Sequence, residues 1–280
     1  MDTLIIATNF SDSCTNAAKY GAALSEQLAV KEIVLLNSYE LPITSEVSIA
    51  DSSHITMLRD RSLEKLGDLQ KQLMPLLAED ININIIASDI SILKSLELLR
   101  KKSPNSIVIM GASRKGRIEK LIMGSTTSSL VRNAPLPLLI IPQDSHFVLI
   151  KKAVYAVNFK KLTKNTPIQT ITTIVRQLNA QVLVLNVGHN EGDNLKPDLT
   201  EDIYELDNFM ESEKPQYYYT ENKNIADGIL SFSDEQEADL LITVPKDYAL
   251  FESIFHKSTS KVLANKTHLP LLILKEKKDE

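Results

Sequence analysis

Two short motifs occur twice in this chain in the same order, and no other feature of the sequence limits the fold as strongly. The tetrapeptide ATNF at 7–10 returns as AVNF at 156–159, each time after an aliphatic run and before a helical pattern. The pentapeptide LPLLI at 136–140 returns at 269–273, each time closing its half. The first pair is 149 residues apart and the second 133, which fits trimmed loops and helices within one repeated fold. The sequence therefore predicts two similar domains, over residues 1–145 and 150–280.

The length and composition of the chain are consistent with this division. Its 280 residues, 43% of them hydrophobic, are enough for two cores of about 140 residues each. No apolar run approaches the roughly 18 residues that cross a bilayer, and the start Met1-Asp2-Thr3 lacks the basic residues of a signal peptide. We therefore expect a cytoplasmic protein with no membrane partner.

Short apolar runs alternate with helical patterns in both predicted domains. In the first we expect strands at 3–8, 32–38, 81–88, 106–111 and 137–141, and helices at 13–29, 52–77, 92–102 and 126–133. In the second we expect strands at 152–157, 181–187, 216–220, 240–244 and 270–274, Pro167 at an early helical position, and a short second helix at 200–211. Such alternation requires right-handed crossovers and a parallel sheet, so the predicted class is α/β.

The long second helix of the first domain has apolar residues at helical spacing. We expect these residues to form its buried stripe: Met57, Leu63, Leu66, Leu69, Leu73 and Met74. In the second domain, alternation predicts that Tyr217, Tyr218 and Tyr219 pack on opposite faces of a strand.

The closing strands of both domains are too apolar to remain bare sheet edges. We expect them to cover each other, so that the two domains pair about a pseudo-twofold axis and one chain imitates a symmetric homodimer. Two independent domains joined by a linker are the alternative, and association of whole chains into a homo-oligomer stays open.

Three of the eight glycines of the chain fall within 14 residues after one predicted strand, at Gly111, Gly116 and Gly124. Glycines let backbone amides approach an anion, and the helix start that follows offers unpaired N–H groups and the positive end of its dipole. The hydroxyls of Ser125 and Thr126 add donors there. Positive charge is available from nearby side chains, namely Arg114, Lys115 and Arg117. The segment therefore predicts a phosphate site.

Two common phosphate motifs do not match this segment. Gly111 and Gly116 have the spacing of a P-loop, but Arg117 and Ile118 stand where Lys and Ser or Thr are needed. No G-x-G-x-x-G follows the first predicted strand, which disfavours a Rossmann dinucleotide site.

The segment resembles the signature of the universal stress protein family: Gly, two residues, Gly, nine residues, Gly and Ser or Thr. Here it runs Gly111, Arg114 where the second glycine is usual, and Gly124-Ser125. The likeness extends to 8–11 (TNFS), similar to a Thr-Asp-Phe-Ser start, and to 33–38 (IVLLNS), similar to a second strand that ends beside adenine.

The resemblance implies a flavodoxin-like fold, also described as adenine nucleotide alpha hydrolase-like, with strand order 3-2-1-4-5 in each domain. It also implies binding of ATP or AMP, with Mg²⁺ accompanying ATP. The residues that it places at the nucleotide are Thr8, Asn9, Ser38, Gly111, Arg114, Gly116, Gly124, Ser125 and Thr126. The order brings strands 1 and 4 together where the crossovers diverge, which is where ligands of such sheets collect.

Two departures from the family pattern bear on binding. Asn9 replaces an acid, so its side chain can donate as well as accept hydrogen bonds. Arg114 replaces a glycine, which costs about 1 to 2 kcal/mol if the backbone there is left-handed, although its guanidinium could also reach a phosphate.

The second domain departs further from the pattern. An ungapped alignment puts Val244 for Gly111, and the other counterparts are Asp247 for Arg114, Ala249 for Gly116 and Lys257 for Gly124, with Ser258 retained. We expect no nucleotide there, because the glycines are gone and a carboxylate repels phosphate.

Other functions find little support in the sequence. The five histidines have no ligand spacing and Cys14 is the single cysteine, so no metal site is expected. A net charge of -5 without a basic stretch argues against nucleic acid as a partner. The leading hypothesis is a stress-response protein regulated by adenine nucleotide. The alternative is an interaction scaffold or small-ligand binder without nucleotide, and weak ATP hydrolysis stays open.

Overall fold

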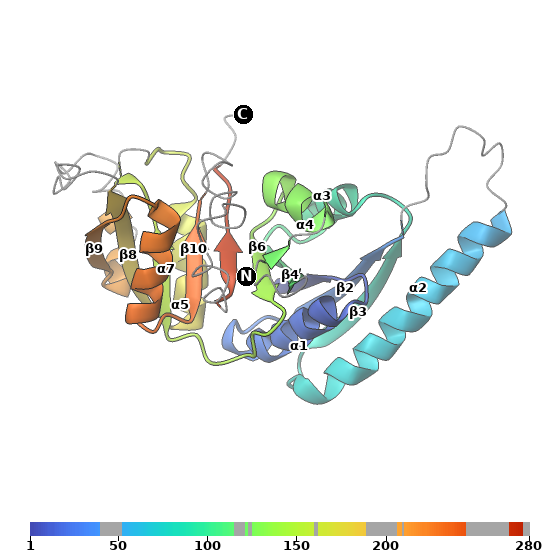
Figure 1. Cartoon of the computed structure of the whole chain (residues 1–280). Helices are drawn as coiled ribbons and strands as arrows, with labels where there is room; N and C mark the ends of the chain where they lie inside the picture. Colours follow the sequence, from blue (N-terminus) through green and yellow to red (C-terminus); the bar gives the residue numbers. More distant parts are fainter. Residues whose placement is uncertain are drawn as a thin grey trace. The chain divides into compact units, whose positions relative to one another are not determined.

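The fold is described from a computed structural model, which covers residues 1–39, 52–114, 121–122, 125–159, 162–188, 206–208, 210–244 and 269–276. The chain divides into two compact units (Figure 1). The first comprises Met1–Ala112 and Met123–Phe147, and the second Ser113–Ile122 and Val148–Glu280.

The first unit contains a parallel sheet in the order β3-β2-β1-β4-β6. Its strands are β1 (Thr3–Ala7), β2 (Glu32–Ser38), β3 (Asn82–Ser88), β4 (Ser106–Arg114) and β6 (Leu138–Pro142). Every residue of β1 and of β6 is buried, as expected for continuous apolar runs with helices on both faces. The predicted α/β class with a mostly parallel sheet is confirmed.

The helices of this unit lie on both faces of its sheet. They are α1 (Asp12–Gln27), α2 (Ser52–Leu73) with the 3-10 turn η1 (Met74–Leu76), α3 (Ile92–Lys102) and α4 (Ser125–Asn133). Helix α1 packs beside α2 on one face, and α3 beside α4 on the other (Figure 1). The start of α3 is fixed by Ser91, whose Oγ accepts a hydrogen bond from the N–H of Lys94, and its end has three basic residues.

Strand β4 is longer than the sequence predicts. We expected it to end at Gly111, but it continues to Arg114 and pairs antiparallel with β5 (Leu121–Ile122), Ser113 lying opposite Ile122. Gly111 is therefore inside a strand rather than in a loop. Arg114 has extended backbone, so the left-handed penalty considered for it does not arise.

The predicted buried stripe of α2 is only partly correct. Leu66, Leu69 and Leu73 are buried, but Met57 and Met74 are 55% and 59% exposed. For Met57 the reason is length, because α2 extends past the sheet in Figure 1 and none of its residues from 53 to 61 is buried. Met74 lies beyond the end of α2, in η1.

The second unit contains a parallel sheet in the order β9-β8-β7-β10-β11. Its strands are β7 (Lys152–Ala156), β8 (Gln181–Gly188), β9 (Gln216–Glu221), β10 (Leu240–Thr243) and β11 (Leu271–Ile273). Its helical segments include α5 (Ile168–Leu178), η3 (Glu211–Glu213) and α7 (Ile225–Glu235).

Two predictions for the helices of the second unit differ from what the structure shows. Pro167 is the N-cap residue of α5 and lies before its first turn, not within it. The helix predicted at 200–211 lies partly outside the described residues, and Leu206–Asn208 and Met210 are helical. Within the part of the chain that the structure describes, no helix has the length and apolar character to cross a bilayer.

Candidate functional site

The carboxyl ends of β1 and β4 lie side by side in the middle of the first unit's sheet. Ile6 pairs with Ile109, which brings Thr8 level with Gly111 on the neighbouring strand. Helix α1 leaves β1 toward one face, and the chain after β4 leads to α4 on the other (Figure 1). The crossovers diverge at this edge, the usual ligand position in open α/β sheets.

Two side chains shape the turn that follows β1. Thr8 Oγ1 accepts a hydrogen bond from the N–H of Phe10 (2.9 Å), and Asn9 Oδ1 accepts one from the N–H of Ser11 (3.0 Å). Phe10 has φ 66°, in the left-handed region that non-glycine residues seldom adopt. Because Oδ1 of the exposed Asn9 faces the turn, its side chain presents the Nδ2 donor to a ligand.

Gly111 is required by packing. A Cβ atom at this position would lie 2.2 Å from the carbonyl oxygen of Ser13, in the first turn of α1. From the sequence, this glycine is expected to let a phosphate approach the backbone. The structure gives it a different use, because it lets β4 run against the start of α1.

The other predicted site residues are only partly described. Ser38 ends β2, and its Oγ donates a hydrogen bond to the carbonyl oxygen of Ile90 (2.8 Å), so toward a ligand it offers an acceptor. Thr126 is exposed in the first turn of α4. Outside the described part of the chain lie Gly116, Gly124 and the side chains of Arg114 and Ser125.

Sequence reasoning missed Asn37, which supports the Asn9 turn from β2. Asn37 Nδ2 donates to the carbonyl oxygen of Thr8 (2.7 Å), while the N–H of Thr8 donates to the carbonyl oxygen of Leu36 (2.9 Å). A polar residue within a buried apolar strand gives no periodic signal. The internal repeat does give a signal for Asn37, because Asn186 lies at the matching position of the second unit.

The second unit repeats this strand geometry. The pairing of Lys152 with Gln181 matches that of Thr3 with Glu32, each 149 residues earlier. Asn186 Nδ2 likewise donates to the carbonyl oxygen that follows its first strand, at 3.2 Å.

Helix α5, however, begins late. Ile168 matches Lys19, which lies seven residues after the first residue of α1, and the described residues 162–167, which match 13–18 of α1, are not helical. Val244 stands in the place of Gly111 in this unit. Of the other loop counterparts, Asp247, Ala249, Lys257 and Ser258 lie outside the described residues.

Aromatic side chains gather on one face of β9. The ring of Phe159 lies 6.4 Å from that of Tyr217 and 5.7 Å from that of Tyr219, whereas Tyr218 contacts Phe232 on the other face. The predicted alternation of the three tyrosines is confirmed. Burial, and then the hydrogen bond to Asp207, raise the pKa of Tyr217 far above its usual value.

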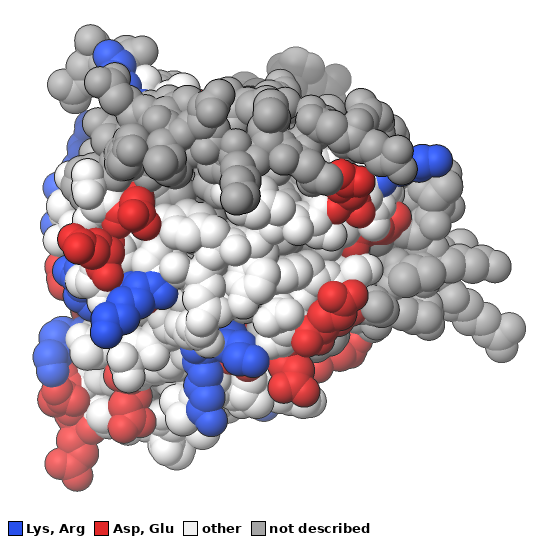
Figure 2. Space-filling view, turned by 90° about the vertical axis from the view of Figure 1, so that its left-hand side faces the viewer, with Lys and Arg blue, Asp and Glu red and all other residues white. Residues whose placement is uncertain are grey.

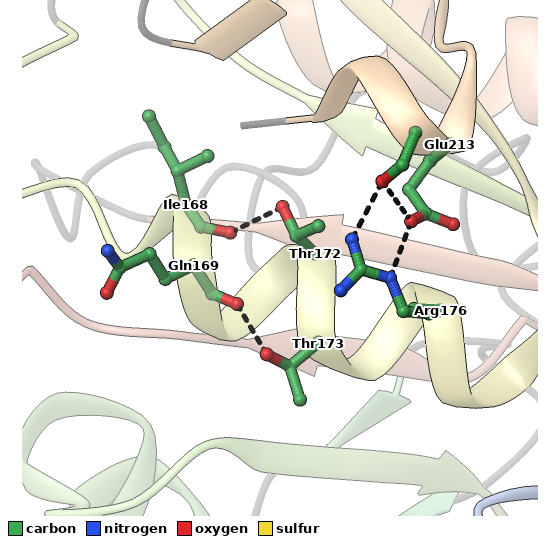
Figure 3. Close-up of polar contacts among 7 residues, drawn as sticks. Ile168, Gln169, Thr172, Thr173, Arg176 and Glu213 are labelled. Carbon is green, nitrogen blue, oxygen red and sulfur yellow. Dashed lines mark hydrogen bonds and ion pairs between the residues drawn. The ribbon is translucent and has the colours of Figure 1, made fainter. Parts of the chain in front are cut away.

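A short polar cluster, the clamp, lies just before β9 in the chain. Figure 3 shows Arg176 of α5 donating from Nε to Glu213 (2.8 Å) and from Nη2 to Ser212 Oγ (2.7 Å), both in η3. Ser212 Oγ also donates to Glu213. The clamp joins η3 to α5.

The charges around these elements are mixed. Figure 2 shows acidic and basic side chains interspersed around a largely uncharged centre on one face. No group of three or more His, Cys, Asp or Glu side chains that could hold a metal ion occurs among the described residues.

The sequence profile of the universal stress protein family matches residues 1–142, just over half of the chain. The fold and the matched region together define the class, and the chain belongs to the universal stress protein family. The predicted family is confirmed. None of the curated proteins matches the sequence.

Several solved structures resemble the whole chain. One is a universal stress protein from Archaeoglobus fulgidus DSM 4304, with a TM-score of 0.69, 16% identity and 98% of each chain covered. Another is a protein of unknown function from Pseudomonas aeruginosa PAO1, with a TM-score of 0.55, 13% identity, and coverage of 99% of this chain and 93% of that one. At these identities the likeness concerns the fold.

Proposed function

We propose that the chain is a regulatory protein that binds one adenine nucleotide, ATP or AMP, at the carboxyl ends of β1 and β4 in its first unit. The observation that carries the proposal is the position of Asn9, exposed on a fixed turn beside the strand that contains Gly111. The family match at 1–142 falls on the first unit, which supports this choice of unit.

The residues divide between the two ends of the ligand. Asn9 Nδ2 donates to the adenosine part, and the hydroxyl of Ser38 accepts from it, since its proton is already donated to Ile90. The phosphates lie at the start of α4, where the N–H groups of the first turn and the hydroxyl of Thr126 are donors. The remaining contacts of the proposal come from Arg114 at the end of β4, from Gly116 and Gly124, and from Ser125 at the start of α4.

Binding without turnover is the activity that we propose. ATP would bring Mg²⁺ as the counterion of its phosphates. Hydrolysis is tested separately, by incubating the protein with ATP and Mg²⁺ and separating the products by chromatography.

The test is calorimetric titration of the whole protein with AMP, comparing Asn9→Ala with Asn158→Ala. Asn158 holds the same place in the second unit, so it is the matched control. We expect Asn9→Ala to weaken binding about tenfold, the effect of one lost hydrogen bond of about 1.4 kcal/mol. Asn158→Ala should bind like the wild type. No heat up to millimolar AMP, or equal effects of the two variants, would contradict the proposal.

One observation favours a second candidate, an interaction scaffold or small-ligand binder. The cluster of Phe159, Tyr217 and Tyr219 is not fully covered, because Tyr219 is 42% exposed. This candidate gains support if wild-type protein purifies without nucleotide and binds none, and if Tyr219→Ala abolishes a binding activity that Asn9→Ala leaves intact.

Pairing of the domains at 1–145 and 150–280 about a pseudo-twofold axis, homo-oligomer formation and a cytoplasmic location remain predictions. Light scattering from the first domain expressed alone tests the pairing. We expect a dimer, because its closing strand would lack its intrachain partner, and a stable monomer would contradict the pairing.

A further inference from the structure

One buried side chain joins helix α2 to the turn that carries Asn9. Asn37 is 7% exposed and uses both ends of its amide. Its Nδ2 donates to the carbonyl oxygen of Thr8, and its Oδ1 accepts from the hydroxyl of Ser62, each at 2.7 Å. Ser62 is itself buried, in the middle of α2. The path from the Asn9 turn to the helix therefore consists of two short hydrogen bonds.

A second contact joins the same two elements. Lys65 Nζ lies 5.2 Å from the centre of the Phe10 ring, within the range of a cation–π interaction. Lys65 follows Ser62 by three residues, so both side chains project from one face of α2. The turn from Thr8 to Ser11 is thus held by β2 from one side and by α2 from another.

The second unit repeats only one of the two hydrogen bonds of this link among its described residues. Asn186 repeats the hydrogen bond to the chain after the first strand. Among the described residues, none donates a hydrogen bond to Asn186 Oδ1. Within the part of the chain that the structure describes, the complete link from the turn to a helix therefore occurs in the unit that retains Gly111.

We infer that Asn37 is a positioning residue of the nucleotide site and that α2 is the element that responds when the site is filled. This inference rests on the proposed function. A ligand that contacts Asn9 restricts the motion of the turn. Because Asn37 is hydrogen-bonded both to the turn and to Ser62, the motion of α2 is restricted as well, and α2 becomes more ordered.

The outer half of α2 is suited to report such a change. Its residues 53–61 are not buried, so this half depends on the packed half for its position. Along it lies a shallow hollow of about 840 Å³, lined by Ser53, Thr56, Met57, Asp60, Arg61 and Glu64. A change of order at Ser62 and Lys65 therefore alters a surface that is open to solvent.

The test is amide hydrogen exchange of the full chain with and without saturating AMP, after calorimetry has given each variant's affinity. We expect AMP to slow exchange in α2 of the wild type by about threefold or more, because ordering lowers the population of open states. Ser62→Ala should keep its affinity within about threefold of the wild type but lose the slowing in α2. Lys65→Met removes the charge at an exposed position and keeps a long apolar side chain, and it should lose part of the slowing in α2.

Asn186→Ala is the matched control, since it removes the repeated hydrogen bond of the second unit and should leave both affinity and slowing unchanged. Retention of the full slowing in Ser62→Ala and Lys65→Met would overturn the inference while nucleotide binding stands. Equal loss in Asn186→Ala would also overturn it, because the effect would then be a general loosening. No AMP binding by the wild type would remove the proposed function, and this inference with it.

Discussion

The side chain that Gly111 lacks would lie against the backbone of Ser13. Backbone cannot move aside as the end of a flexible side chain can, so even a methyl group forces β4 and α1 apart. The effect differs at Gly67, on α2, where an added Cβ meets nothing within 4 Å.

These two glycines make a matched pair for a stability measurement. We expect Gly111→Ala to lower the free energy of unfolding by about 1 to 3 kcal/mol through overpacking. Gly67→Ala should raise it by up to about 1 kcal/mol, since alanine is the better helix former. Urea denaturation of both variants measures the difference. Equal stabilities would show that Gly111 is not needed for packing.

Tyr155 places a phenol in the core of the second unit. Its side chain is 1% exposed, and its hydroxyl has no hydrogen-bond partner among the described residues. Burial, and then the negative charge of Glu276, raise the pKa of Tyr155 well above its ordinary value of 10.0. The unfolded chain therefore releases this proton at a lower pH than the folded protein does.

The sign of the pH effect follows from that order. Below pH 10 the raised pKa of Tyr155 has no effect on the free energy of unfolding. Above pH 10 the free energy of unfolding falls by about 1.4 kcal/mol per pH unit, because the unfolded chain loses the proton first. We expect Tyr155→Phe to have a free energy of unfolding within about 1 kcal/mol of the wild type at pH 8. At pH 11 it should have gained about 1.4 kcal/mol relative to the wild type. A difference that does not change between the two pH values would contradict the assignment.

At the scale of elements, the sequence predicts most strands and helices of the first unit to within one or two residues. Apolar runs and helical periodicity decide these, as at β2 and α3, whose bounds agree with prediction. The extension of β4 was missed because it depends on pairing with β5, a contact without a local pattern. The late start of α5 was missed because the chain before it is held by turns and by the buried Leu162.

Helix α2 has two halves that should respond differently to truncation. Leu66 is fully buried on the sheet, whereas Met57 lies on the outer half. Leu66→Ala should lower the free energy of unfolding by about 2 to 5 kcal/mol, and Met57→Ala by less than about 0.5 kcal/mol. Thermal or urea denaturation measures both. A large loss for Met57→Ala would mean that the outer half packs against something in solution.

The candidate site was predictable in place but not in detail. The repeat and the glycine cluster direct attention to the ends of β1 and β4. The link from Asn37 to Ser62 could not be predicted, because it joins residues 25 apart whose side chains face each other only after β2 and α2 have packed.

At the scale of the whole molecule, the two units have the same strand order but differ in the helices and side chains at the carboxyl edge of the sheet. The first has a 16-residue α1 pressed against Gly111 and a 22-residue α2. The second has an 11-residue α5, a valine in place of the glycine, and an aromatic cluster. We therefore propose that nucleotide binds to one unit of each chain, the first.

Native mass spectrometry of the intact protein with an excess of AMP tests this assignment most directly. The account predicts one nucleotide mass per chain, present in Asn158→Ala and reduced in Asn9→Ala. A chain that carries no nucleotide, or two that are lost independently from the two units, would contradict it.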